Sequence, residues 1–341
     1  FSRSLFLFLA LSPMAVNACD LCGCYTPQLE AMPDMAGPSP PAWFSRFYSA
    51  IGEQFTRFAT LQLDGDEVSN PTGQYLNSSI TQWVGGYEFT SRFALQLSVP
   101  VIYRDFKRPE GFQIDRGNVS GVGDVSLLLR TAAFHYKSAA PRSFDVGGKN
   151  PIATEREPDF TASLVLLTGV KFPTGDPSRL KEEFHEVNIP NLPASAIHGH
   201  DLALGTGSYD GVFGEQSSLR YKSMFFETNI QFTLRGDGAH QYHFANDLTW
   251  NAGPGYYFVR RKNTILGLQL AVSGEHKDVD RFRGDQAEDT GITSVFVGPR
   301  VVASHDRFSA EISTELPVWI NNTALQAVPD YRLRGAISFH F

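Results

Sequence analysis

The sequence lacks three features that would assign it to common classes of protein. Its mean hydropathy is only −0.19, so no bundle of membrane helices is expected. It has no excess of basic residues, since the formal net charge is −7, and this argues against nucleic acid as a partner. It contains no C-x-x-C-H motif, which excludes a c-type haem site.

Aromatic residues and glycine are, by contrast, plentiful. Aromatic side chains make up 13% of the 341 residues, with 27 Phe against 4 Met, which is high for a soluble enzyme. A transmembrane β-barrel combines such a composition with moderate hydropathy, because its lipid face carries aromatic girdles while its lumen stays polar. Composition therefore favours a barrel.

The last eleven residues, Tyr331 to Phe341, alternate with a period of two. Large apolar side chains fall on one face of the expected strand, and Arg332, Arg334 and His340 fall on the other. A strand that ends on an aromatic residue resembles the closing strand of bacterial outer-membrane barrels. The resemblance implies that the assembly machinery recognises Phe339 and Phe341. The alternative is the edge strand of a soluble sandwich.

The first 18 residues are typical of a signal peptide. Arg3 precedes an apolar run from Leu5 to Val16, and Ala18 offers a small residue at the cut. The run is too short to span a membrane. Export is therefore expected, and cleavage would leave Cys19 first, where lipidation is one alternative.

All three cysteines lie in a short motif, Cys19, Cys22 and Cys24. The spacing C-x-x-C-x-C allows thiolates to converge on a soft metal ion such as copper or zinc. A disulfide with a spare thiol, or a lipidated cysteine with a disulfide, explains the motif equally well. Residues 25–42 are rich in proline, so 19–42 is expected to be a periplasmic segment and linker before a barrel over 43–341.

The remainder divides into strand-like segments joined alternately by short turns and long polar links. Tight turns are expected at 90–91, 214–216, 260–262 and 305–306, and longer links at about 64–77, 106–120, 173–199, 277–290 and 321–329. Two links depart from the alternation, a long one at 137–157 and a short one near 236–239. The twelve expected strands span about 44–63, 78–89, 92–105, 121–136, 158–172, 200–213, 217–235, 240–259, 263–276, 291–304, 307–320 and 330–341. This predicts an all-β fold, an antiparallel up-and-down transmembrane barrel of about twelve strands.

Polar residues that alternate with lipid-facing apolar residues are candidates for the lumen, because charge on the lipid face is costly. The candidates are Asp124, Arg130, Glu227, Asn229, Gln231, Gln269, Glu311 and Glu315. Twelve strands enclose a lumen between those filled by side chains and those that form broad channels. The pore is therefore expected to be narrow, gated or plugged.

Glycine motifs carry a resemblance to a known family. Gly121-Val-Gly-Asp124 opens an expected strand, Pro173-Thr-Gly-Asp176 ends one, and Gly205-Thr-Gly-Ser-Tyr-Asp210 lies within another. With Gly298-Pro299, these motifs resemble, over about 78–341, the outer-membrane family named for the MetA pathway of phenol degradation. The resemblance implies an outer-membrane transporter of small, often apolar molecules, and no catalytic residues. The cysteine motif departs from the family's usual pattern.

Other chemistry has less support in the sequence. The glycine motifs lack the following helix that would present amides to a phosphate. His198 and His200, with Glu182, Glu183 and Glu186 nearby, could bind a divalent metal, but a solvated acidic loop explains them as well. No spacing of Ser, His and acid singles out a hydrolase, so an enzyme is not expected.

The sequence therefore predicts an outer-membrane channel that passes a small solute, embedded in lipid by the barrel-assembly machinery. Two alternatives use the cysteine segment: capture of copper or zinc, and a structural barrel that docks a periplasmic redox or metal partner.

Overall fold

The computed structural model describes residues 46–138, 142–143, 154–155, 158–185, 190, 192–261 and 263–341. Within this part of the chain, twelve long antiparallel strands form one sheet that closes on itself, so the predicted all-β barrel is confirmed. The strands are β1 (Phe47–Leu63), β3 (Tyr75–Glu88), β4 (Phe93–Glu110), β6 (Ser126–Lys137), β9 (Phe160–Lys171), β10 (Asp210–Tyr221), β11 (Met224–Leu234), β13 (Asp247–Arg261), β14 (Thr264–Lys277), β17 (Ile292–His305), β18 (Phe308–Asn322) and β19 (Leu325–His340).

Closure comes from the pairing of the first and last strands. β19 runs antiparallel to β1 from the pair Tyr48 and His340 to the pair Leu63 and Leu325, with a register shift near Phe58. Every other barrel strand pairs with its neighbours in chain order. The strands thus satisfy one another's backbone hydrogen bonds, as a lipid environment requires.

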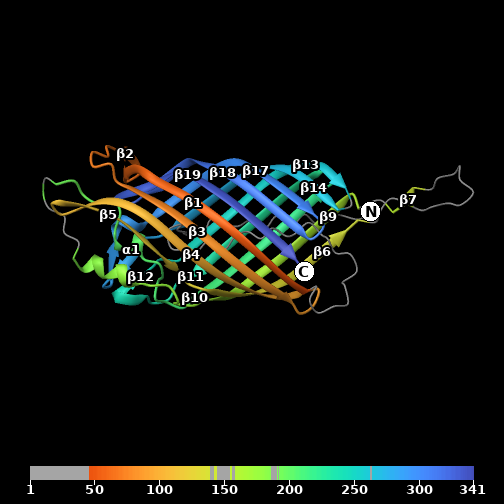
Figure 1. Ribbon diagram of the computed structural model, residues 1–341, viewed down its shortest axis with the longest axis horizontal. Coiled ribbons are helices and arrows are strands. Elements are labelled where there is room, and N and C mark those ends of the chain that lie inside the picture. The colour runs from red at the N-terminus through yellow and green to blue at the C-terminus, as the bar shows by residue number, and fades with distance from the viewer. Residues whose placement is uncertain are drawn as a thin grey trace, which may run out of the picture.

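The two ends of the barrel differ. One end, the turn end, carries the start of β1, the C-terminus and the short turns at 89–92, 222–223 and 306–307. The other end, the loop end, carries the links 64–74, 172–209, 235–246 and 278–291. Figure 1 shows α1 (Gly199–Leu202), β2 (Asp66–Val68), β5 (Gln113–Val122) and β12 (Tyr242–His243) at the loop end. The predicted long link between β6 and β9 lies at the turn end and holds β7 (Arg142–Ser143) and β8 (Thr154–Glu155).

The wall is interrupted where β5 passes into β6. β5 pairs with the second half of β4, from Val101 to Glu110, whereas β6 pairs with the first half, from Phe93 to Ser98. Between them lie residues 123–125, which belong to no strand. β6 also pairs with β9, but in the described part of the chain β5 has only β4 as a neighbour.

Two boundary predictions on this side were wrong. The expected turn at 214–216 lies inside β10, which starts at Asp210 rather than 200 and turns at Lys222 and Ser223. Gly214 belongs to the strand because the backbone of Ile230 approaches to within 2.7 Å of where a Cβ would be. The expected loop at 106–120 is a hairpin of β4 and β5, which turns at Gly111 with φ of +58°.

Two predictions near the other loops were also wrong. The expected link at 321–329 is a two-residue turn between β18 and β19, with Ala324 at φ of +50°. The short link near 236–239 is part of a longer connection, because β13 begins only at Asp247. This connection contains η3 (Ala239–Gln241) and β12.

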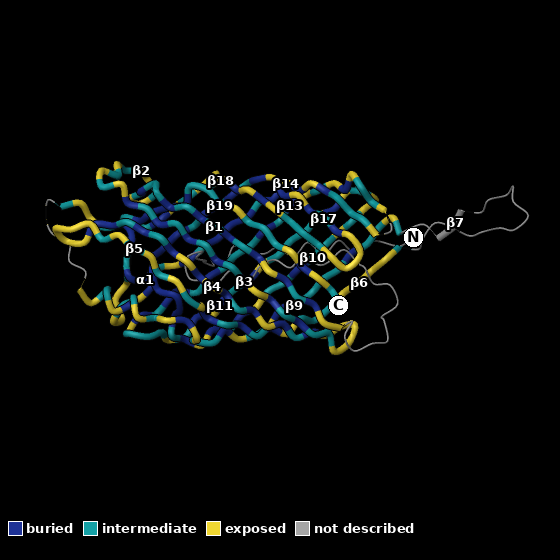
Figure 2. The backbone as a smooth tube through the Cα atoms, viewed as in Figure 1, coloured by how far each residue is buried: buried dark blue, intermediate teal, exposed yellow. Residues whose placement is uncertain are grey.

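Buried residues alternate with more exposed ones along the strands (Figure 2), as expected if side chains point in turn to the interior and to the outer surface. In β4, Leu97 and Val101 are exposed on the outside, while Gln96 and Ser98 are buried inside. The outer face also carries carboxylates: Glu53 of β1 points outward and accepts hydrogen bonds from the hydroxyls of Ser79 and Thr81, and Glu215 lies on the outward face of β10. No helix among the described residues is long and apolar enough to cross a membrane.

Candidate functional site

The barrel interior holds seven of the eight residues proposed for the lumen within alternating strands. Each faces inward beside an exposed apolar neighbour, as Leu268 and Leu270 flank Gln269. Gln231, Gln269 and Glu315 are buried, while Arg130, Glu227, Asn229 and Glu311 are half-buried. Asp124 lies instead at the break between β5 and β6, and its side chain is buried.

Four neighbouring strands of the twelve, β14, β17, β18 and β19, carry paired charges on their interior face. Arg300 donates to Gln269 at 3.0 Å and pairs with Glu311. Arg334 pairs with Glu315 at 3.2 Å, and Arg332 with Glu275 at 3.1 Å. The hydroxyl of Ser273 also donates to Glu315, and the guanidinium of Arg334 to Gln54.

These ion pairs determine the surface that a solute meets in the lumen. A buried ion pair adds little net stability, but separation of its partners leaves an unpaired buried charge, which is costly. The paired side chains are therefore held in place. Arg332 and Arg334 fell on the polar face of the last strand in the sequence but were not among the proposed lumen residues. Their alternation with Leu333 was the signal that would have identified them.

The three glycine motifs of the sequence meet at Asp124. One carboxylate oxygen accepts a hydrogen bond from the backbone N–H of Gly175 at 2.9 Å. The other accepts from the backbone N–H of Thr206 at 2.9 Å and from the Lys171 ammonium at 3.0 Å. We call this cluster, with Asp124, Lys171, Gly175 and Thr206, the Asp124 hub. It joins β9 and the link 172–209 to the irregular residues before β6, where the wall is interrupted.

Glycine is required at the hub because two backbone segments touch. A Cβ on Gly205 would lie 2.6 Å from the backbone of Gly175, and one on Gly175 would lie 2.4 Å from the carbonyl oxygen of Leu204. No side chain fits at either position. The motifs that carry the family resemblance thus serve a close packing of the link against the wall.

A second buried charge cluster continues from the hub. Lys171 also pairs with Asp210 at 2.7 Å, and Arg235 bridges Asp210 at 2.9 Å and Asp247. All four side chains are almost fully buried. These bonds tie β9, β10, β11 and β13 together at the loop end. None of these four residues was proposed for the lumen from the sequence; β10 and β13 begin at Asp210 and Asp247, whereas their strands were expected to begin at about 200 and 240.

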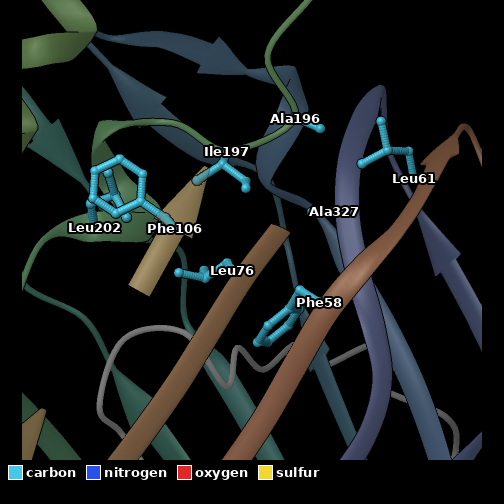
Figure 3. Close-up of a cluster of buried hydrophobic side chains, with 8 residues drawn as sticks. All are labelled: Phe58, Leu61, Leu76, Phe106, Ala196, Ile197, Leu202 and Ala327. Atoms are coloured by element: carbon cyan, nitrogen blue, oxygen red, sulfur yellow. The ribbon is translucent and has the colours of Figure 1, made fainter. Parts of the chain in front are cut away.

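The described residues of the link 172–209 fold into the loop end of the barrel. Ala196, Ile197 and Leu202 from this link pack against inward side chains of four strands (Figure 3). The strand residues are Phe58 and Leu61 of β1, Leu76 of β3, Phe106 of β4 and Ala327 of β19. An apolar cluster therefore fills this side of the interior at the loop end.

Hydrogen bonds fix the link to the strands. Arg104, which is fully buried, donates to the carbonyl oxygen of Ala203 at 2.8 Å. The Gln74 side chain donates to the carbonyl of Ala194 and accepts from the N–H of Ala196, both at 2.9 Å. The backbone of Ala196 also accepts from Ala327 of β19 at 3.0 Å.

Three links at the loop end are joined through histidine. His200 Nδ1 lies 3.0 Å from Glu183 Oε1, and its ring stacks on His198 and on Tyr242. His198 Nε2 lies 3.1 Å from Asp289 of the link 278–291. The Tyr242 hydroxyl donates to Asp280 at 2.6 Å. We call the three links 172–209, 235–246 and 278–291 the mouth cap.

The histidines are held by carboxylates within the mouth cap. Burial disfavours a charge on His200, but Asp201, Glu183 and Asp289 outweigh it and raise its pKa to about 10. Among the described residues, no group of three or more His, Cys, Asp or Glu side chains has a geometry that could hold a metal ion. His200 is therefore a charged residue that connects the links of the mouth cap through its contacts with Glu183, His198 and Tyr242.

Phe339 and Phe341, proposed as an assembly signal, are exposed at the turn end with their rings edge to face at 5.1 Å. Their recognition by the assembly machinery stays a prediction. Cys19, Cys22 and Cys24, like the signal peptide and linker, lie outside the described residues.

We expect the variant Asp124→Ala to loosen the mouth cap, because it removes the acceptor for two backbone N–H groups and leaves Lys171 with one fewer carboxylate. Loss of one partner of a buried pair costs about 3 kcal/mol. Urea unfolding in detergent and limited proteolysis of 172–209 measure the effect. Asp306→Ala, in the exposed β17–β18 turn, is the control, and equal protease sensitivity of the two variants would contradict the role of the hub.

The charge on His200 makes cap stability depend on pH. The folded pKa of about 10 lies above the ordinary value of 6.5, so the stabilisation is complete below pH 6.5 and is lost as pH rises through 10. The difference in unfolding free energy between the wild type and His200→Gln should therefore narrow over this range, by at most about 1.4 kcal/mol per pH unit. With the exposed His305→Gln as control, a difference for His200→Gln that stays constant with pH would refute the assignment.

Comparison with known proteins places the fold. No family model matches the sequence, and no curated protein is significantly similar to it. Among solved structures, an outer-membrane channel from Pseudomonas putida F1 is similar, with a TM-score of 0.50 and 14% identity over 89% of this chain and 98% of that one. The β domain of the Bordetella autotransporter BrkA follows with a TM-score of 0.42 and 10% identity, over 86% of this chain and 99% of that one. The chain has the fold of an outer-membrane β-barrel.

Proposed function

We propose that the chain is an outer-membrane channel that passes a small solute by passive or facilitated diffusion. The observation that carries the proposal is a closed barrel whose outer face is apolar while its interior is lined by polar and charged side chains. The likeness to a channel structure agrees with it at the level of the fold. Selectivity would come from interior charge and from the cover over the mouth, with no catalytic step.

The two ends suggest an orientation. Outer-membrane barrels have short turns in the periplasm and longer loops outside. The turn end would then face the periplasm and the mouth cap the exterior. The segment that precedes β1 would start on the periplasmic side, because β1 begins at the turn end.

The mouth cap would control passage. Its apolar cluster and hydrogen bonds occupy the interior beside β1, β3, β4 and β19, so a solute that enters from outside meets the cap first. Below it, the ion pairs of Arg300, Arg332 and Arg334 present a polar surface without a large excess of charge. This combination suits a narrow, gated channel rather than an open porin.

Conductance in planar lipid bilayers tests the proposal. We expect the wild type to give small current steps and Arg104→Met to give larger ones, because the variant cannot donate to the carbonyl groups that end α1. Arg57→Met, on the outer face of β1, is the matched control and should conduct like the wild type. Folded protein that never conducts, in the wild type and in Arg104→Met alike, would overturn the channel and favour a structural barrel.

Metal handling by the cysteine segment is the alternative proposal, based on the C-x-x-C-x-C spacing alone. The metal content of the full chain, compared with Cys22→Ser/Cys24→Ser, tests it. Stoichiometric copper or zinc that disappears in the variant is the expected result if the segment binds metal. Equal metal content in the two proteins would remove this alternative.

A further inference from the structure

A side-chain bridge crosses the interior between the turn end and the middle of the barrel. Arg130 of β6 donates through Nη1 to the Tyr48 hydroxyl of β1 at 3.3 Å and through Nη2 to Gln216 Oε1 of β10 at 3.2 Å. In the closed sheet these strands follow the order β1, β3, β4, β6, β9 and β10. The bridge therefore connects β1 with β10, the first and last of six neighbouring strands, through Arg130 of β6. These side chains reach across the interior and narrow the lumen.

Tyr48 is placed for this contact by its surroundings. Its ring lies over Gly86, where an added Cβ would be 2.0 Å from the ring. Its hydroxyl donates to Gln96 at 3.2 Å, which leaves the oxygen lone pairs to accept from Arg130. His340 stacks on the ring with 5.6 Å between centroids. The phenol is thus fixed beside the guanidinium.

Arg130 differs from most cations of the interior in its partners. Lys171, Arg235, Arg300, Arg332 and Arg334 each have a carboxylate within ion-pair distance. Among the residues that the structure describes, Arg130 bonds only to a phenol and an amide, both neutral, and its buried Nε has no hydrogen-bond partner there. The nearby carboxylate, Glu88, acts on it from beyond contact distance. The bridge therefore carries a positive charge that no described side chain neutralises by contact.

We propose that Arg130 is an anion-binding residue at this narrow point and that the solute class is small organic monocarboxylates, an inference that rests on the proposed channel. A guanidinium presents a planar fork that binds a carboxylate through two hydrogen bonds. The two hydrogen bonds that Arg130 donates are longer than 3.1 Å, and both acceptors are neutral. A carboxylate forms shorter and stronger bonds to a guanidinium, so it would displace the amide of Gln216. A single unneutralised cation, with Glu88 near, suits a monoanion better than a polyanion.

The test measures propionate binding to the folded full chain in detergent by calorimetry, and reversal potential across bilayers in a potassium chloride gradient. Arg130→Gln should weaken propionate binding by about tenfold or more, because a charge-assisted hydrogen bond is lost. The same variant should also be less selective for chloride over potassium, which shifts the reversal potential. Arg130→Lys keeps the charge without the fork and should bind with intermediate affinity. Arg57→Gln removes the same side chain from the outer face and should match the wild type. A heat-dependent shift in gel mobility shows that each variant is folded.

The outcomes separate this site from the channel itself. Arg130-dependent binding supports the site even in a protein that does not conduct, in which case the channel proposal alone fails. Conductance with equal binding and equal reversal potential in the wild type and Arg130→Gln overturns the site and leaves the channel in place. Absence of propionate binding by the folded wild type also overturns it.

Discussion

The pairing of β1 with β19 is the interaction on which the rest of the structure depends. In hydrocarbon an unpaired strand edge has no solvent to satisfy its backbone groups, so an open sheet of this length could not remain in a membrane. The same pairing sets the register of the interior. A slip of one residue would turn Arg332 and Arg334 toward lipid and Leu333 into the lumen. The ladder of ion pairs along β14 to β19 therefore exists only because the seam closes in one register.

Where strand pairing is interrupted, side chains and loop backbone replace it. Residues 123–125 leave the ladder between β5 and β6, and Asp124 accepts there the backbone hydrogen bonds of Gly175 and Thr206. The link 172–209 is thus both part of the wall and part of the mouth cap. Movement of the link in the mouth cap would therefore also alter the wall at this point, because the Asp124 carboxylate bonds the link to the wall.

Alternation and turns made much of this fold predictable. The sequence predicted that Leu268 and Leu270 lie on one face of a strand and Gln269 on the other. In the structure both leucines are exposed and Gln269 is buried. Gly214 misled the prediction because glycine marks both turns and close strand contacts, and local sequence does not distinguish them. The Asp124 hub could not be predicted for another reason. Its contacts in the other two glycine motifs, Gly175 and Thr206, lie 51 and 82 residues from Asp124, and no local pattern indicates that they meet. The Tyr48 contact to Arg130 likewise joins strands that are not neighbours.

The position of the apolar cluster in the mouth cap has a consequence for the order of assembly. Ile197 and Leu202 pack between residues of β1 and Ala327 of β19, so their binding surface exists only once the first and last strands have met. Those strands are joined by contacts that span about 280 residues, such as Arg334 to Gln54. Contacts of such sequence separation form late, because the long intervening chain must first be brought together. During assembly the barrel therefore passes through a stage in which β1 and β19 have paired but the apolar cluster of the mouth cap has not yet packed.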